Sequence, residues 1–198
     1  MDIDAWWTLI ERARTAVGDR ADDRNLPDDP LPRALTDLLA ELDAAEIIEF
    51  ALLEIRVTDS AYVRSLWNAA YLIEGGCGDD GFMDFRDGLV LQGRETFTRA
   101  VADPDSLADL PVVKLMGRDN GGWIGYEGLS YLAREAYGRV MGEIGSFDAA
   151  MEAAVPHLDR PARASGEDWD VEDDDENRRR LPRLSALFLG EEFTGEDG

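Results

Sequence analysis

The residues whose types and spacing could do chemistry are concentrated between Trp67 and Arg94. Polar and aromatic side chains interrupt two apolar stretches in this run, and a purely structural connection would not require so many charges. We interpret them as a candidate pocket for a small ligand or substrate. The members of this candidate pocket are Trp67, Tyr71, Cys77, Asp79, Asp80, Arg86, Gln92 and Arg94.

The glycine-rich part of the run admits two specific chemistries. Gly76, Gly78 and Gly81 match the spacing of a dinucleotide fingerprint, but that motif follows a strand, and the pattern predicts a helix before these glycines. Cys77 could be a nucleophile at a helix N-terminus with His157 as its base. The alternative for Cys77 is a small buried thiol packed beneath the loop, and this interpretation is favoured.

Asp79 and Asp80 suggest a cation site, but two acids are too few for calcium, which takes roughly six to eight oxygen ligands. We therefore expect no metal ion and no cofactor. Capping preference instead predicts that one aspartate caps a helix beginning near Gly81, while the other pairs with Arg86 or Arg94. Both structural roles are compatible with ligand binding.

Apolar side chains recur every three or four residues along much of the chain and predict amphipathic helices. Asp43 is expected to cap one helix and Gly75 to end another, with a brief break at residues 58–60. The predicted helices cover residues 3–17, 31–42, 44–57, 61–74, about 80–93, 94–102 and 127–142.

Residues 111–126 have the only composition that suggests extended chain, and their glycines favour a loop or small hairpin. Trp123 lies in this glycine-rich part, where an aromatic side chain could be exposed and used for binding. The sequence thus predicts a mainly α fold, with a single compact helical domain over residues 1–160.

Residues 161–198 are predicted to form an acidic C-terminal segment. Eight acids occupy the ten positions of residues 167–176, and such a block is usually solvated and mobile. It could also act as an electrostatic mimic that captures a basic protein partner. The apolar motif that follows either docks back on the domain, which burial favours, or awaits a partner. This motif consists of Leu181, Leu184, Leu187 and Phe188.

Composition excludes several classes of partner. The 198 residues include 43 Asp and Glu against 20 Lys and Arg, and the resulting charge of −23 repels phosphate backbones and anionic lipids. We therefore expect neither nucleic acid nor a membrane surface as a partner. One cysteine and one histidine exclude an intramolecular disulfide and a Cys/His zinc cage. An acidic N-terminus and the absence of a long apolar run predict a cytoplasmic protein.

The run from Trp67 to Arg94 resembles the signature of the bacterial family catalogued as domain of unknown function 4240. Members of that family pair a Trp-x-Ala-Ala-Tyr helix with Gly-Gly-Cys-x-Asp-Asp-x-Phe and a following Phe-Arg…Gln-Gly-Arg helix. Segments at residues 6–13, 102–108, 131–137 and 181–184 resemble the family as well. The resemblance implies an architecture and one important loop, but no chemistry.

This sequence departs from the family at Gly78, where serine is frequent, and at Gly88, where tryptophan is frequent. Loss of an aromatic side chain at Gly88 is expected to open that face of the helix.

These observations favour a non-catalytic binding or interaction protein, because no complete catalytic set, metal cage or phosphate loop is visible. Its negative charge suits a basic protein partner. The alternative is an enzyme or small-ligand sensor with its pocket at the Gly75–Phe82 loop. Whether the protein is an enzyme stays open at this point.

Overall fold

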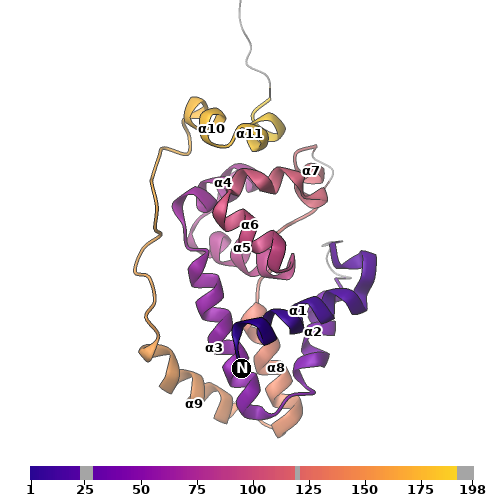
Figure 1. The fold of residues 1–198 in the computed structure, drawn as a ribbon. Coiled ribbons are helices and arrows are strands. Elements are labelled where there is room, and N and C mark those ends of the chain that lie inside the picture. Colours follow the sequence, from indigo (N-terminus) through magenta and orange to yellow (C-terminus); the bar gives the residue numbers. More distant parts are fainter. Residues whose placement is uncertain (23–28, 119–120, 191–198) are drawn as a thin grey trace, which may run out of the picture.

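The structure is a computed structural model that describes residues 1–22, 29–118 and 121–190. In these residues, helices follow one another without any β-strand, apart from one isolated bridge between Val63 and Ser165 (Figure 1). The mainly α fold is therefore confirmed. With η for the 3-10 helices, the elements are α1 (Ile3–Val17), η1 (Gly18–Asp22), α2 (Leu31–Leu39), α3 (Ala44–Ser60), α4 (Arg64–Glu74), α5 (Asp79–Leu91), α6 (Arg94–Ala102), η2 (Pro104–Asp109), α7 (Pro111–Met116), α8 (Leu129–Met141), α9 (Gly145–Ala154), η3 (Val155–His157), α10 (Asp174–Arg180) and α11 (Pro182–Phe188).

Residues 23–28, 119–120 and 191–198 lie outside the described residues. They belong to the predicted domain, to the predicted extended stretch and to the predicted acidic segment, respectively. Within the described ranges, no helix combines the length and apolar character needed to cross a membrane.

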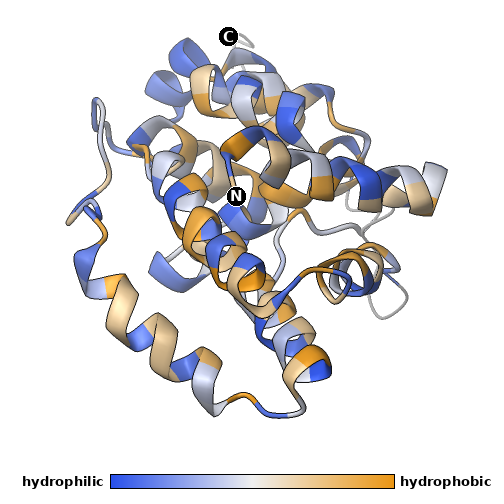
Figure 2. Cartoon of the chain, turned by 60° about the horizontal axis from the view of Figure 1, so that its bottom comes forward, coloured by the Kyte–Doolittle hydropathy of each residue, from blue (hydrophilic) through white to orange (hydrophobic). Residues whose placement is uncertain are grey.

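Helices α1, α2, α3 and α8 pack together in one half of the fold, and α4 to α7 form the other half (Figure 1). The long helix α3 contacts α1, α8 and α9 and also α5, so it links the two halves. The core contains Trp6, whose ring stacks on Phe50 at 5.2 Å between centroids and whose indole N–H donates to the Phe50 carbonyl at 3.0 Å. This bond satisfies the one polar atom of a buried tryptophan. Hydrophilic and hydrophobic residues alternate along the helices, as amphipathic packing requires (Figure 2).

Local sequence sets the ends of α3 and α4. Asp43 accepts a hydrogen bond from the N–H of Glu46, and the Glu46 side chain accepts one from the N–H of Asp43, which completes a capping box. α4 ends at Gly75, whose φ of 67° lies in the left-handed region that favours glycine. Both predicted helix ends are confirmed.

The break predicted at residues 58–60 is wrong in position. α3 continues to Ser60, and the chain leaves the helix only at residues 61–63. The hydroxyls of Thr58 and Ser60 donate to the backbone carbonyls of Glu54 and Val57, so these polar side chains are satisfied without leaving the helix.

The extended stretch predicted over residues 111–126 is wrong for its first six residues, which form α7. Pro111 occupies the first helical position, where its missing N–H needs no partner. The rest of the stretch, as far as the structure describes it, is a loop without strand pairing. This loop passes so close to α5 that a Cβ on Gly88 would lie 1.9 Å from the carbonyl oxygen of Ile124. Loop backbone therefore fills the face that the missing aromatic was expected to open.

The C-terminal helices lie against the half of the fold that contains α4 (Figure 1). Leu181 and Leu184 are buried, and α11 contacts α4 and η2. Arg180 pairs with Glu167 and Glu176, each at 2.7 Å. Part of the acidic run is thus engaged within the chain, while the domain boundary at residue 160 stays a prediction.

Candidate functional site

The eight residues of the predicted pocket fall into three groups along α4 and α5. Asp80 and Gln92 are twelve residues apart at the two ends of α5, which corresponds to about 18 Å of helix. One group therefore surrounds the start of α5, Arg86 lies in its middle, and Gln92 and Arg94 lie at its end.

Asp79 and Asp80 are exposed in the first turn of α5. Gly78 occupies the N-cap position, so no side chain caps this helix. Arg86 donates to the Thr58 carbonyl and Arg94 to Asp4. The predicted cap and the predicted pairing with Arg86 or Arg94 are therefore both wrong. The aspartates instead place negative charge beside the positive end of the helix dipole.

Cys77 is buried in the turn between α4 and α5, and only 8% of it is exposed. Burial, together with the charge and hydrogen bond of Glu74, raises the pKa of the Cys77 thiol to about 12. His157, the candidate base, is exposed in η3, directly after α9. In Figure 1, α9 lies beside the start of α3, whereas α4, which leads to Cys77, lies beyond the other end of α3. A protonated thiol so far from that base is not a nucleophile at neutral pH. The geometry agrees with the small buried thiol.

The surroundings of Cys77 tie three segments together. Trp67 donates its indole N–H to the Cys77 carbonyl at 2.8 Å and stacks on Phe82 at 4.9 Å. Trp123 donates its indole N–H to Glu74 at 3.2 Å, so this loop tryptophan is bound to α4. Burial raises the pKa of Glu74 to about 7. These contacts hold the loop that carries Trp123 against the turn between α4 and α5.

Arg86 and Tyr71 also make contacts that fasten the fold. The buried guanidinium of Arg86 donates to the Thr58 carbonyl at 2.9 Å and lies over the ring of Tyr62, 4.9 Å from its centroid. It thereby joins α5 to the end of α3. The Tyr71 hydroxyl donates to Glu172 at 3.1 Å and joins α4 to the C-terminal segment.

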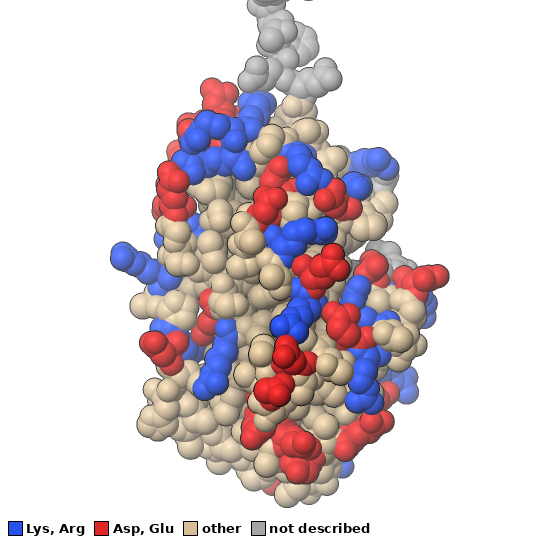
Figure 3. Space-filling model, viewed as in Figure 1, with Lys and Arg blue, Asp and Glu red and all other residues tan. Residues whose placement is uncertain are grey.

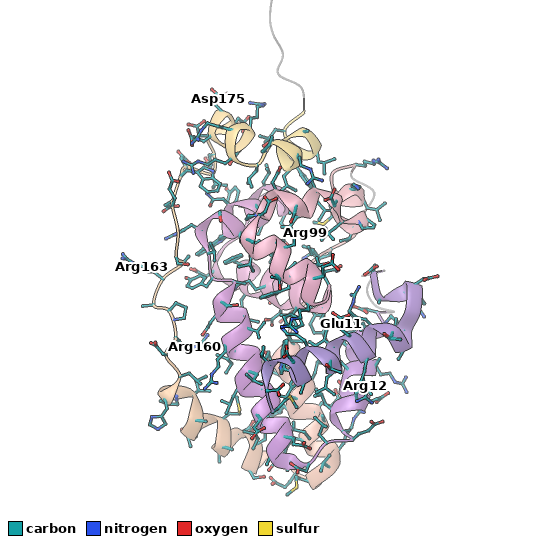
Figure 4. All side chains as sticks on the ribbon, viewed as in Figure 1. Glu11, Arg12, Arg99, Arg160, Arg163 and Asp175 are labelled. Carbon is teal, nitrogen blue, oxygen red and sulfur yellow. The ribbon has the colours of Figure 1, made fainter. Side chains whose placement is uncertain are left out.

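Gln92 and Arg94 line an open cleft of about 750 Å³ between α1 and α6, which we call the α1–α6 cleft. Figure 4 labels Glu11 on α1 and Arg99 on α6, one from each wall. The lining residues are Glu11, Arg14, Gln92, Gly93, Arg94, Glu95, Thr96, Thr98, Arg99 and Ala102.

Gln92 carries the one unpaired buried polar atom of this lining. It ends α5, it is only 5% exposed, and its amide Nε2 has no hydrogen-bond partner within the described protein. Gly93 turns the chain into α6 with a φ of 91°, and Glu11 and Arg14 pack so tightly that a Cβ there would lie 2.8 Å from the Glu11 carboxylate. Gln92 therefore directly precedes a tightly packed turn.

The lining of the cleft contains three arginines and two glutamates. Arg14 donates to the Leu91 carbonyl and to Asp22, each at 2.6 Å, and Glu11 accepts the backbone N–H of Arg94 at 2.8 Å. Exposed Arg99 has no partner among the described residues. Gly93, at the N-cap of α6, has no side chain to cap this helix, and Glu11 takes the first N–H, that of Arg94. Acidic and basic side chains are interspersed on the face that carries α1 and α6 (Figure 3).

A buried carboxyl pair, Glu54 of α3 and Asp87 of α5, was missed by sequence reasoning. Burial and the charge of Asp87 raise the pKa of Glu54 well above its usual range, and burial raises the pKa of Asp87 to about 7. Asp87 also accepts the backbone N–H of Leu129 and so caps α8 from another helix. The spacing of apolar residues could have indicated that Glu54 is buried, because Glu54 lies three residues from both Ala51 and Val57 on the buried face of α3.

A family model described as a protein of unknown function (DUF4240) matches residues 1–139. No curated protein and no solved structure matches the chain. The matched range includes every lining residue of the α1–α6 cleft and both members of the buried carboxyl pair, whereas α9, α10 and α11 follow it.

Proposed function

We propose that this chain, which belongs to the DUF4240 family of proteins of unknown function, binds a small anionic molecule in the α1–α6 cleft. The observation that carries the proposal is the side-chain amide of Gln92, which is buried in the cleft wall with its Nε2 unpaired. Leaving a buried donor unpaired costs about 1–3 kcal/mol. A rotation of the Gln92 side chain toward the cleft would let a ligand oxygen accept this N–H and remove that cost, so the cleft can suit an acceptor.

The arginines of the cleft supply charge for the same ligand. Arg14, Arg94 and Arg99 lie in its lining, in a chain that has only 20 basic residues against 43 acidic ones. Arginine presents planar pairs of N–H donors that suit carboxylate and phosphate oxygens. The partner of Arg94 is the exposed carboxylate of Asp4, which a ligand carboxylate can replace at little cost because exposed ion pairs contribute little stability.

A basic protein partner is the competing proposal, and the acidic run was its basis. Within that run, Glu167 pairs with Arg180, and Glu176 pairs with both Arg179 and Arg180. Asp168 lies 3.7 Å from Arg64. These internal ion pairs leave less free charge for a partner than the sequence alone indicates. The cleft has a specific unpaired donor, so it supports the ligand proposal better.

The test is an NMR titration with inorganic phosphate, citrate and butanoate at constant ionic strength. We expect saturable shifts of the Gln92 side-chain amide and of the Glu95 and Thr96 backbone amides. The variant Q92L should bind more weakly yet unfold at the same or a higher urea concentration, because leucine leaves no unpaired donor. Anions that leave the Gln92 amide signals unmoved would refute the proposal.

Two exposed arginines offer a matched comparison. Arg99 and Arg163 both lack a partner among the described residues, but only Arg99 lines the cleft (Figure 4). R99A should weaken anion binding by about tenfold, which corresponds to the loss of one charge-assisted hydrogen bond. R163A should bind like the wild type. Equal effects of the two variants would indicate general electrostatic attraction and not a cleft.

A further inference from the structure

The α1–α6 cleft adjoins an apolar groove. This groove, of about 610 Å³, lies between the start of α1, the second half of α3 and α6. Arg94, Thr98 and Ala102 belong to the walls of both the cleft and the groove, so the two hollows meet along this row of α6 side chains. The apolar lining of the groove consists of Ile3, Trp7, Leu53, Val57, Phe97, Val101 and Ala102.

The charged lining of the groove is entirely basic. Arg56 and Arg94 are its charged members, and no acidic residue lines it, although acids outnumber bases about twofold in the chain. Arg56 is exposed and has no partner among the described residues, while Arg94 pairs with exposed Asp4. An apolar groove whose lining has two arginines and no acid favours an occupant that is apolar and anionic.

We infer that the ligand of the α1–α6 cleft is an amphipathic anion, with carboxylate or phosphate oxygens at Gln92 and the arginines and an apolar body in the groove. This inference rests on the proposed function, because it specifies the ligand class of the same cleft. From Arg94 to Val101 the ligand follows seven residues of α6, which is about 10 Å. A medium-length alkyl chain covers this distance.

The experiment is a titration with acetate, butanoate, hexanoate and octanoate at constant ionic strength. Each buried methylene contributes about 0.8 kcal/mol, so affinity should rise by up to about fourfold for each added CH2 group. Octanol and octyltrimethylammonium test the charge, and both should bind at least about tenfold more weakly than octanoate, the equivalent of one charge-assisted hydrogen bond.

The outcomes separate the two proposals. If all four carboxylates bind at the cleft with equal affinity, the amphipathic ligand is refuted and anion binding stands. If octanol binds as well as octanoate while acetate still shifts the Gln92 amide signals, the amphipathic anion is again refuted and anion binding stands. If no anion shifts these signals, both are refuted.

A pair of variants tests the position of the apolar body. Val101 lines the groove, whereas Val140 is a half-exposed valine of α8 outside it. V101N should reduce the gain in affinity from butanoate to octanoate, and V140N should leave that gain unchanged. Both carry the same helix-propensity change, and their urea unfolding curves report any loss of fold. An unchanged gain in folded V101N would overturn the inference.

Discussion

Replacing Asp87 with asparagine should remove a large part of the pH dependence of stability. Burial raises the pKa of Asp87 from 3.8 to about 7, and a pKa difference of one between the folded and unfolded states corresponds to about 1.36 kcal/mol, so the full effect is about 4 kcal/mol. The folded protein holds a proton that the unfolded chain releases. The stability from this group is therefore complete below about pH 4 and is lost as the pH rises toward 7. Asparagine is isosteric, does not ionise, and keeps an oxygen for the N–H of Leu129.

Urea unfolding, followed by circular dichroism at several pH values, measures this effect. Because the pI is near 4.2, the practical range is pH 5–8, which contains about 3 kcal/mol of the effect. The free energy of unfolding of D87N minus that of the wild type should rise by this amount from pH 5 to pH 8. D175N removes a carboxylate that is 88% exposed and should leave the wild-type pH profile unchanged. Parallel profiles for D87N and the wild type would show that Asp87 is not held protonated by burial.

Three further predictions concern packing and the thiol. G88A should destabilise the protein by about 3 kcal/mol in urea unfolding, because its Cβ would meet the Ile124 carbonyl oxygen at 1.9 Å; a neutral effect would contradict the close approach of the loop. L184A removes a fully buried side chain of α11 and should cost about 2–5 kcal/mol; calorimetry should show one lower melting transition, and separate melting of α11 would contradict its packing on α4. Alkylation of Cys77 by iodoacetamide at pH 8 should be about a thousandfold slower in the folded than in the urea-unfolded protein, because its pKa is raised from 9.0 to about 12; equal rates would show an accessible thiolate.

Helices with strong local signals could be predicted from the sequence, and those set by contacts could not. Asp43 and Gly75 mark helix ends through short-range hydrogen bonds and backbone conformation, so their effect is readable from neighbouring residues. α9 gave no such signal, because Phe147 is its one buried residue and no apolar stripe results. The sequence predicts extended chain in place of α7, because Val112 and Val113 are of a type typical of strands. Both are buried in a short helix beside η2.

The candidate site was only partly predictable for a similar reason. Residue type identifies Gln92 and Arg94 as candidates, but proximity in sequence groups them with Cys77 and the aspartates. Their actual neighbours, Glu11, Arg14 and Arg99, come from α1 and α6 and meet them only through tertiary packing. The spacing of residues within one helix does not indicate which residues of another helix will contact them.

The concentration of chemically versatile residues around α5 follows from its position between α3, α4 and α6. Where neighbouring helices surround α5, its polar side chains form hydrogen bonds within the fold. Arg86 donates to the Thr58 carbonyl, and Asp87 accepts a backbone N–H at the start of α8. At its first turn, Asp79 and Asp80 are solvated. At its end, Gln92 is desolvated by packing yet left without a partner in the described protein. Of these three environments, only the last combines the cost of burial with an unmade hydrogen bond, and only there does a bound ligand gain what the fold itself does not supply.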